Sequence, residues 1–298
     1  MTLETDHGVP SQSASSWDGA QYAQHTAHHR AFDHLLVERI GELSTDAYVI
    51  DIGCGAGDLT RQWAARVPDG MVLGIDADES MIRTAGSGPH LPHLLFRTLP
   101  AQRLAEAEQP GRVDAIVSTA CLHWIPAEEQ PALLASAWTL LRPGGLWCVE
   151  FGGVGQLAEV RTVLDPLAAA FGSSGHRWFF PSASEYAALL TAAGFVQVET
   201  ALVRQQRVLA GPGGVAGWLT SQVLMARSPF DKAEPPHTLQ PTSHGTTTGA
   251  MTRVSSIKPS RAPSGAVFRI RPYSPKLPAS AKAIQGGRPA HQVSHSTP

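Results

Sequence analysis

Short apolar runs alternate along this chain with longer segments whose apolar residues recur at helical spacing. Stretches between the runs place apolar side chains three and four positions apart, as amphipathic helices do. Strands that alternate with helices are typical of a parallel sheet. The pattern predicts an α/β fold with a doubly wound, mostly parallel sheet and helices on both faces. The predicted strands are Val49–Ile52, Val72–Asp76, Leu94–Arg97, Val113–Ser118, Leu146–Phe151 and Phe195–Arg207.

The first predicted strand runs directly into a loop containing three glycines. Gly53, Gly55 and Gly57 alternate with other residues, and Asp58 follows as the expected N-cap of the next helix. Glycine lacks a Cβ atom, so the backbone can turn sharply there and a ligand can approach it closely. A strand, a glycine loop and a helix N-terminus together predict a nucleotide-binding corner.

The spacing of these glycines narrows the class of nucleotide. It is G-x-G-x-G, which differs from the dinucleotide fingerprint, and no lysine follows as in a phosphate-binding P-loop. Asp51 precedes the glycines, where it could accept from an ammonium group. Asp76 ends the second strand 19 positions after Gly57, where a carboxylate can accept from both ribose hydroxyls.

Four segments in order then give a family resemblance: Asp51–Gly57, Gly74–Met81, Asp114–Ser118 and Leu141–Gly145. With these motifs the chain resembles the class I S-adenosylmethionine-dependent methyltransferases, from about Trp17 to about Ala226. The resemblance implies a Rossmann-like fold and S-adenosyl-L-methionine as cofactor. The cofactor-binding residues that it implies are Asp51, Gly53, Cys54, Gly55, Gly57, Asp76, Ala77, Met81, Ala101, Gln102 and Thr119.

The segment after the third strand departs from the family pattern. Pro100 stands where the family usually has an acid beside the adenine amino group. An exocyclic amine needs only an acceptor, so Gln102 or a backbone carbonyl could substitute.

The end of the fourth strand carries the candidate catalytic group. Leu122-His123-Trp124 resembles a small-molecule branch of the family, similar to the trans-aconitate methyltransferases, in which this run lines the junction of cofactor and substrate pockets. His123 is the candidate general base, since imidazole titrates near neutral pH. The alternative is a structural imidazole bonded to a backbone carbonyl, with Trp124 packed beside it.

Other aromatic residues and histidines are candidates for the substrate pocket. Trp17, Tyr22 and His25 precede the first strand, where the family folds a segment over cofactor and substrate, and Trp178 precedes a capping box. Packing against an apolar edge explains these residues equally well. No carboxylate or cysteine is patterned with the histidines, so no metal site is expected.

Composition and charge restrict the possible location and partners of the protein. Of 298 residues 43% are hydrophobic, but no run approaches the length of a membrane span and there is no signal peptide. Three scattered cysteines are expected to be reduced thiols of a cytoplasmic protein. Residues 1–225 hold 13 Lys and Arg against 23 Asp and Glu, which argues against a nucleic-acid surface. We therefore expect a small-molecule substrate, no membrane partner, and a monomer or homodimer.

The chain is expected to divide into three regions. Residues 1–16 are polar and expected to be disordered, 17–225 form the methyltransferase domain, and 226–298 form a Pro/Ser/Thr-rich basic tail that is expected to be disordered. The tail holds 11 of the 23 prolines, and 10 Lys and Arg against 2 Asp and Glu. The only candidate in the tail for the family's last antiparallel strand is Ala266–Ile270, and it matches poorly. The tail is either a basic interaction segment or an end outside the family pattern, from a shifted reading frame or recombination.

Three functions remain open at this point. The favoured one is methyl transfer to an oxygen or nitrogen of a small molecule, with a carboxylate or hydroxyl acceptor preferred. A degenerate, non-catalytic cofactor-binding module is the second. A protein or nucleic-acid methyltransferase is the third, although the sequence lacks the Asn-Pro-Pro-aromatic motif used on exocyclic amines.

Overall fold

A computed structural model describes residues 36–37, 39–170, 178–209, 214–219, 223 and 245–257. The elements follow one another mostly as alternating strands and helices. In chain order they are β1 (Tyr48–Ile52), α3 (Asp58–Arg66), β2 (Met71–Asp76), α4 (Glu79–Gly86), β3 (Leu94–Thr98), η1 (Ala101–Glu106), β4 (Val113–Thr119), η2 (Leu122–Trp124), η3 (Ala127–Glu129), α5 (Gln130–Leu140), β5 (Leu141–Gly152), α6 (Ala158–Ala170), α7 (Ala183–Ala192), β6 (Val196–Leu209), α8 (Gly214–Trp218) and β7 (Gly245–Ile257).

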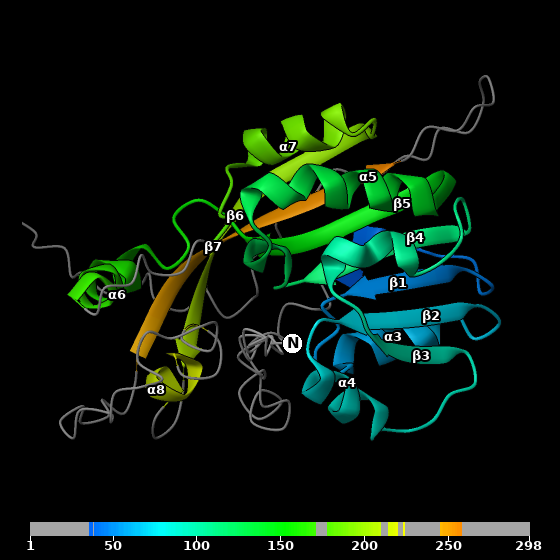
Figure 1. The fold of residues 1–298 in the computed structure, drawn as a ribbon, viewed down its shortest axis with the longest axis horizontal. Helices are drawn as coiled ribbons and strands as arrows, with labels where there is room; N and C mark the ends of the chain where they lie inside the picture. Colours follow the sequence, from blue (N-terminus) through cyan, green and yellow to red (C-terminus); the bar gives the residue numbers. More distant parts are fainter. Residues whose placement is uncertain are drawn as a thin grey trace, which may run out of the picture. The chain divides into compact units, whose positions relative to one another are not determined.

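The strands of this region form one seven-stranded sheet in the order β3-β2-β1-β4-β5-β7-β6 (Figure 1). The first five strands pair in parallel, whereas β7 runs antiparallel to both β5 and β6. The order reverses beside β1, so the carboxyl ends of β1 and β4 lie at a topological switch point, where open α/β sheets bind ligands. The predicted doubly wound, Rossmann-like fold is confirmed.

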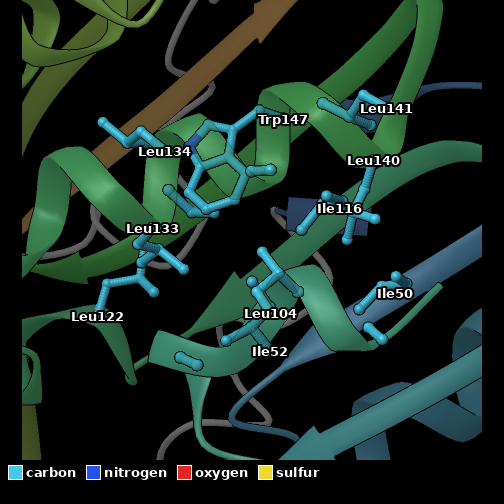
Figure 2. Close-up of a cluster of buried hydrophobic side chains, with 14 of the residues drawn as sticks. Ile50, Ile52, Leu104, Ile116, Leu122, Leu133, Leu134, Leu140, Leu141 and Trp147 are labelled. Carbon is cyan, nitrogen blue, oxygen red and sulfur yellow. The ribbon is translucent and has the colours of Figure 1, made fainter. Parts of the chain in front are cut away.

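One face of the sheet packs against α5, α7 and η1. Ile50 and Ile52 of β1 point to this face and are fully buried together with Trp147 of β5 (Figure 2). Leu133 and Leu134 of α5 close the cluster from the helix side. Apolar side chains on alternate positions of parallel strands are buried on both faces in such folds, and each fully buried Ile or Leu contributes about 1.5–3 kcal/mol.

The opposite face packs against α3. Val49 of β1 and Cys148 of β5 point this way, and Trp63 and Ala64 of α3 cover them. The helix begins one residue earlier than predicted: Asp58 is its first residue rather than its N-cap, and Gly57 occupies the N-cap position with φ 82°. No side-chain hydrogen bond caps this helix. Asp58 lies in the first turn, where its negative charge interacts favourably with the helix dipole.

The expectation that residues 226–298 are disordered is wrong for Gly245–Ile257, which forms β7. This strand fills the gap between β5 and β6, and its Val254 is fully buried opposite Val149. The strand is rich in Thr and contains Val and Ile, which favour extended backbone, but the Pro-rich composition of its surroundings hid it. Ala266–Ile270 lies outside the described residues.

The apolar stripe on α6 is less buried than its spacing predicts. The helical spacing of Leu157, Val160, Val163, Leu164, Leu167 and Phe171 predicts a core stripe, of which Phe171 lies outside the described residues. In the structure Val163 and Leu167 are 61% and 44% exposed, and only Leu157 is buried. Helical periodicity shows which side chains share a face but not whether another element covers that face.

Candidate active site

The glycine loop after β1 has the backbone conformation that its sequence predicts. Gly53, Gly55 and Gly57 all adopt positive φ, at 69°, 53° and 82°. The amide groups of Gly53 and Cys54 both donate to the carbonyl of Ile75 at the end of β2, at 2.8 and 3.0 Å. The loop is therefore pinned to the neighbouring strand, which fixes the nucleotide-binding corner.

At two of these positions neighbouring atoms leave no room for a Cβ atom, so glycine is required. A Cβ atom on Gly53 would lie 2.3 Å from Sγ of Cys121, at the end of β4. A Cβ atom on Gly57 would lie 2.7 Å from the ring of Phe96 and 2.9 Å from the guanidinium of Arg61. The glycine loop thus packs directly on the segment that follows β4.

Asp76 places its carboxylate at the carboxyl end of β2. Oδ2 accepts from the amide of Gly55 and Oδ1 from the amide of Asp78, each at 3.0 Å. Burial raises the pKa of this carboxyl above the ordinary 3.8, although the two amide donors act in the opposite direction. Asp76 therefore connects the glycine loop to the start of α4.

Asp51 is more enclosed than the sequence alone indicates. It is 2% exposed, and its Oδ2 accepts a hydrogen bond of 2.7 Å from the Thr60 hydroxyl of α3. The neighbouring Cys54 is also buried, and burial raises the pKa of its thiol. The carboxylate is thus held in a fixed orientation beneath the glycine loop.

The remaining predicted cofactor residues gather at the ends of β2 and β3. The amide of Leu99 donates to the carbonyl of Asp76, which brings the start of η1 next to β2. Ala77 and Gln102 are exposed, whereas Met81 and Ala101 are buried. These positions lie around Asp76 on the carboxyl edge of the sheet, as expected for a nucleoside site.

A sharp turn follows β4. After Thr119 the chain passes through Ala120 in a left-handed conformation, with φ 52°, while the Ala120 amide donates to the carbonyl of Glu150 at 2.8 Å. A non-glycine residue with positive φ stores strain of about 1–3 kcal/mol and is typical of functional sites. The buried Gln130 steadies the turn, since its amide nitrogen donates to the carbonyls of Leu122 and Ile125.

His123 projects from η2 in this turn. Its Nδ1 accepts from the backbone amide of Gly152 at 3.2 Å, and its carbonyl accepts from the amide of Phe179 at 2.9 Å. Its ring lies 5.4 Å from that of Trp124 and 5.7 Å from that of Phe180. At Nδ1 the structure shows an amide donor and not the backbone carbonyl of the alternative structural role.

Several aromatic rings lie close to His123. Trp178 stacks on Phe180 at 5.9 Å and meets Trp124 edge-on at 6.0 Å. The structure therefore brings together His123, Trp124 and Trp178, which the sequence singled out separately. The other three candidate pocket residues, Trp17, Tyr22 and His25, lie outside the described residues.

The sequence did not identify the residues that hold this site in place. Gly152 stands in the sequence only as the first residue of a Gly-rich segment, yet its amide donates to His123, and a Cβ atom there would lie 2.5 Å from the Phe180 ring. Thr60 and Gln130 carried no signal, because a polar residue on a helix reads as solvent-exposed until its burial is known.

Comparisons with known proteins match this chain to methyltransferases. The family described as "Methyltransferase domain" matches residues 49–145. The trans-aconitate 2-methyltransferase of Deinococcus radiodurans is 37% identical over 139 residues, which cover 45% of this chain and 49% of that protein. The trans-aconitate 2-methyltransferase of Methylobacterium nodulans is 30% identical over 213 residues, which cover 69% and 78%. The match therefore spans about half of the first relative and most of the second.

Solved structures agree in fold. Phosphoethanolamine N-methyltransferase 2 of Haemonchus contortus has a TM-score of 0.55 at 15% identity, covering 81% of this chain and 57% of that chain. The YcgJ protein of Bacillus subtilis has a TM-score of 0.55 at 16% identity, covering 78% and 100%. At this identity the likeness shows the fold alone.

The chain belongs to the class I S-adenosylmethionine-dependent methyltransferases, and its cofactor is S-adenosyl-L-methionine. The glycine loop with its three positive φ angles and the carboxylate of Asp76 fit that cofactor, because they give a backbone open to close approach beside an acceptor for ribose hydroxyls. None of the helices in the described part of the chain is long and apolar enough to cross a membrane.

The raised pKa of Asp76 predicts a pH dependence of cofactor affinity. The sequence predicts that Asp76 accepts from ribose hydroxyls, so binding should favour the ionised carboxylate and weaken as pH falls through the pKa of this carboxyl in the free protein. Because burial raises that pKa above 3.8, the loss of affinity should begin at a higher pH than an exposed aspartate would give. Calorimetric titration with S-adenosylhomocysteine at decreasing pH measures this. An affinity in Asp76→Asn that falls as steeply as in the wild type would contradict the assignment.

Proposed function

We propose that this enzyme transfers a methyl group from S-adenosylmethionine to an oxygen of a small molecule, with a carboxylate as the preferred acceptor. The observation that supports the proposal best is the contact between Gly53 and Cys121. It joins the glycine loop to the turn that carries His123, so a cofactor over the loop would lie beside the aromatic rings of Trp124 and Trp178. Two relatives named as trans-aconitate 2-methyltransferases support a carboxylate acceptor.

The predicted cofactor-binding residues have the following roles in this proposal. Asp76 accepts from the ribose hydroxyls, and Asp51 holds the amino group of the cofactor, directly or through water. Thr119 and the pair Ala101 and Gln102 border the adenine and the methyl end. The glycines and the other predicted cofactor residues allow close approach of the cofactor.

Methyl transfer from a sulfonium cofactor requires little from the protein beyond positioning of the reactants. The cofactor supplies a methyl group that its sulfonium charge already activates for in-line displacement. The protein therefore has to orient the acceptor and exclude water, and orientation alone can be worth about 7–11 kcal/mol of the barrier. The aromatic rings of Trp124, Trp178 and Phe180 suit this task, because they give a rigid apolar wall around the polar group of His123.

The proposal places the enzyme in the cytoplasm, as a monomer or homodimer without a nucleic-acid partner. The acidic charge of residues 1–225 supports the last point, since it would repel phosphate backbones. A non-catalytic cofactor-binding module is the main rival, because Pro100 replaces the usual adenine acid.

Incubation with methyl-labelled S-adenosylmethionine and a panel of acceptors tests the proposal. We expect label to appear on di- or tricarboxylates such as trans-aconitate, with a lower rate on phenols and none on amines. Calorimetry with S-adenosylhomocysteine provides the control for a functional cofactor site. Cofactor binding without transfer to any acceptor would favour the non-catalytic module instead.

A further inference from the structure

One ring nitrogen of His123 is occupied by the protein itself. The backbone N–H of Gly152 donates to Nδ1 at 3.2 Å. A ring nitrogen that accepts a hydrogen bond has a lone pair and no proton, and a neutral imidazole carries a single N–H. This hydrogen bond therefore assigns the proton of the neutral ring to Nε2.

The assigned tautomer decides what His123 can do. A protonated Nε2 donates a hydrogen bond and has no lone pair with which to remove a proton. Nδ1 could take up a proton only by giving up its hydrogen bond to Gly152. The geometry thus favours a hydrogen-bond donor over the general base that the sequence suggests.

The surroundings hold the ring in this orientation. The carbonyl of His123 is fixed by the amide of Phe179, while Gln130 fixes the carbonyl of the preceding Leu122. The rings of Trp124 and Phe180 flank the imidazole at 5.4 and 5.7 Å. A flip of the ring would have to break the bond to Gly152 within this packing.

On the basis of the proposed function, we infer that His123 orients the acceptor by donating from Nε2 to one of its carboxylate oxygens. A carboxylic acid has an ordinary pKa of about 4, so it is already ionised at neutral pH and has no proton to lose. The carboxylate oxygen forms the new bond to the methyl carbon as the bond between methyl and sulfur breaks, and its electron pair goes to sulfur. A hydroxyl acceptor would need a base, which this tautomer does not supply, so the arrangement selects acids over alcohols and phenols.

Two isosteric substitutions separate the possible roles of His123. His123→Asn keeps an acceptor near the position of Nδ1 for the Gly152 amide but has no group at the position of Nε2. His123→Gln extends an amide NH2 group to the position of Nε2 and has no basic nitrogen. For trans-aconitate as probe, we expect kcat/KM to fall about 30-fold in His123→Asn, the loss of one hydrogen bond to a charged group, and to stay within about 3-fold of the wild type in His123→Gln.

The other outcomes would overturn the inference. Equal, large losses in both variants would identify His123 as a base, and an active His123→Asn would show that it serves only to bond Gly152. S-adenosylhomocysteine affinity of each variant shows whether the fold and cofactor site are intact. For a variant that does not fold, ¹⁵N chemical shifts of the histidine rings in the wild type give a second test, since a proton on Nδ1 of His123 would contradict the donor role.

Failure of the underlying function is distinguishable from failure of the inference. If the wild type binds cofactor but methylates no carboxylate, the proposed function is wrong and the inference falls with it. If the wild type methylates trans-aconitate while His123→Gln is as inactive as His123→Asn, the function holds and only the donor role is wrong.

Discussion

Replacing Asp76 with alanine should weaken cofactor affinity by about 1,000-fold. The proposed role of this carboxylate is to accept from two ribose hydroxyls, and each hydrogen bond to a charged group is worth about 1.5–3 kcal/mol. Two such bonds amount to about 4 kcal/mol, and each 1.4 kcal/mol is about tenfold in affinity. Calorimetric titration with S-adenosylhomocysteine measures the effect directly.

The controls for this variant address the second role of the side chain. Asp76 also bonds the amides of Gly55 and Asp78, so its loss could disturb the loop itself. Asp76→Asn keeps one oxygen acceptor and should lose less affinity than the alanine variant. Asp69→Asn, at an exposed position in the turn before β2, removes a charge of the same kind and should leave affinity unchanged. An Asp76→Ala protein that binds as tightly as the wild type would refute the ribose role.

Replacing Gly53 with alanine should lower the free energy of unfolding by about 3 kcal/mol and abolish tight cofactor binding. Two costs add up at this position. A left-handed conformation costs a residue with a Cβ atom about 1–2 kcal/mol, and φ here is 69°. The new Cβ atom would also overlap Sγ of Cys121 at 2.3 Å, and forced overlap in a packed interior costs about 1–3 kcal/mol. Thermal and denaturant unfolding measure the sum.

Gly111 offers a matched control for the first of these costs. It has nearly the same φ, 71°, but a Cβ atom there would meet no other atom within 4 Å. Gly111→Ala should therefore cost only about 1 kcal/mol, and the difference from Gly53→Ala isolates the overlap with Cys121. In a Cys121→Gly background the cost of Gly53→Ala should shrink toward that of Gly111→Ala. Equal destabilisation by both single alanine variants would show that the contact with Cys121 is unimportant.

Much of the fold could be predicted from the sequence because local rules act consistently in it. The β-branched runs, the glycine loop and the capping box formed by Ser182 and Glu185 all appear where the pattern places them. Strand β7 was missed because only pairing with β5 and β6 stabilises it, and long-range pairing leaves little trace in local composition.

The candidate site was predictable in its polar groups but not in their partners. Asp51, Asp76 and His123 could be selected because each lies at or just beyond the carboxyl end of an apolar strand, at the edge where ligands bind. The partner of His123 could not be selected from the sequence, because the amide of Gly152 comes from a distant strand and every residue except proline has such an amide. The tautomer, and with it the difference between base and donor, depends on that one contact.

The most direct test of the account is the chemical nature of the methylated product. Methyl label transferred to trans-aconitate should be released as methanol by mild base, because methyl esters hydrolyse under these conditions whereas methyl ethers and methylamines do not. Label that stays in the product after base treatment, or that reaches only phenols or amines, would contradict the proposal that this enzyme methylates a carboxylate.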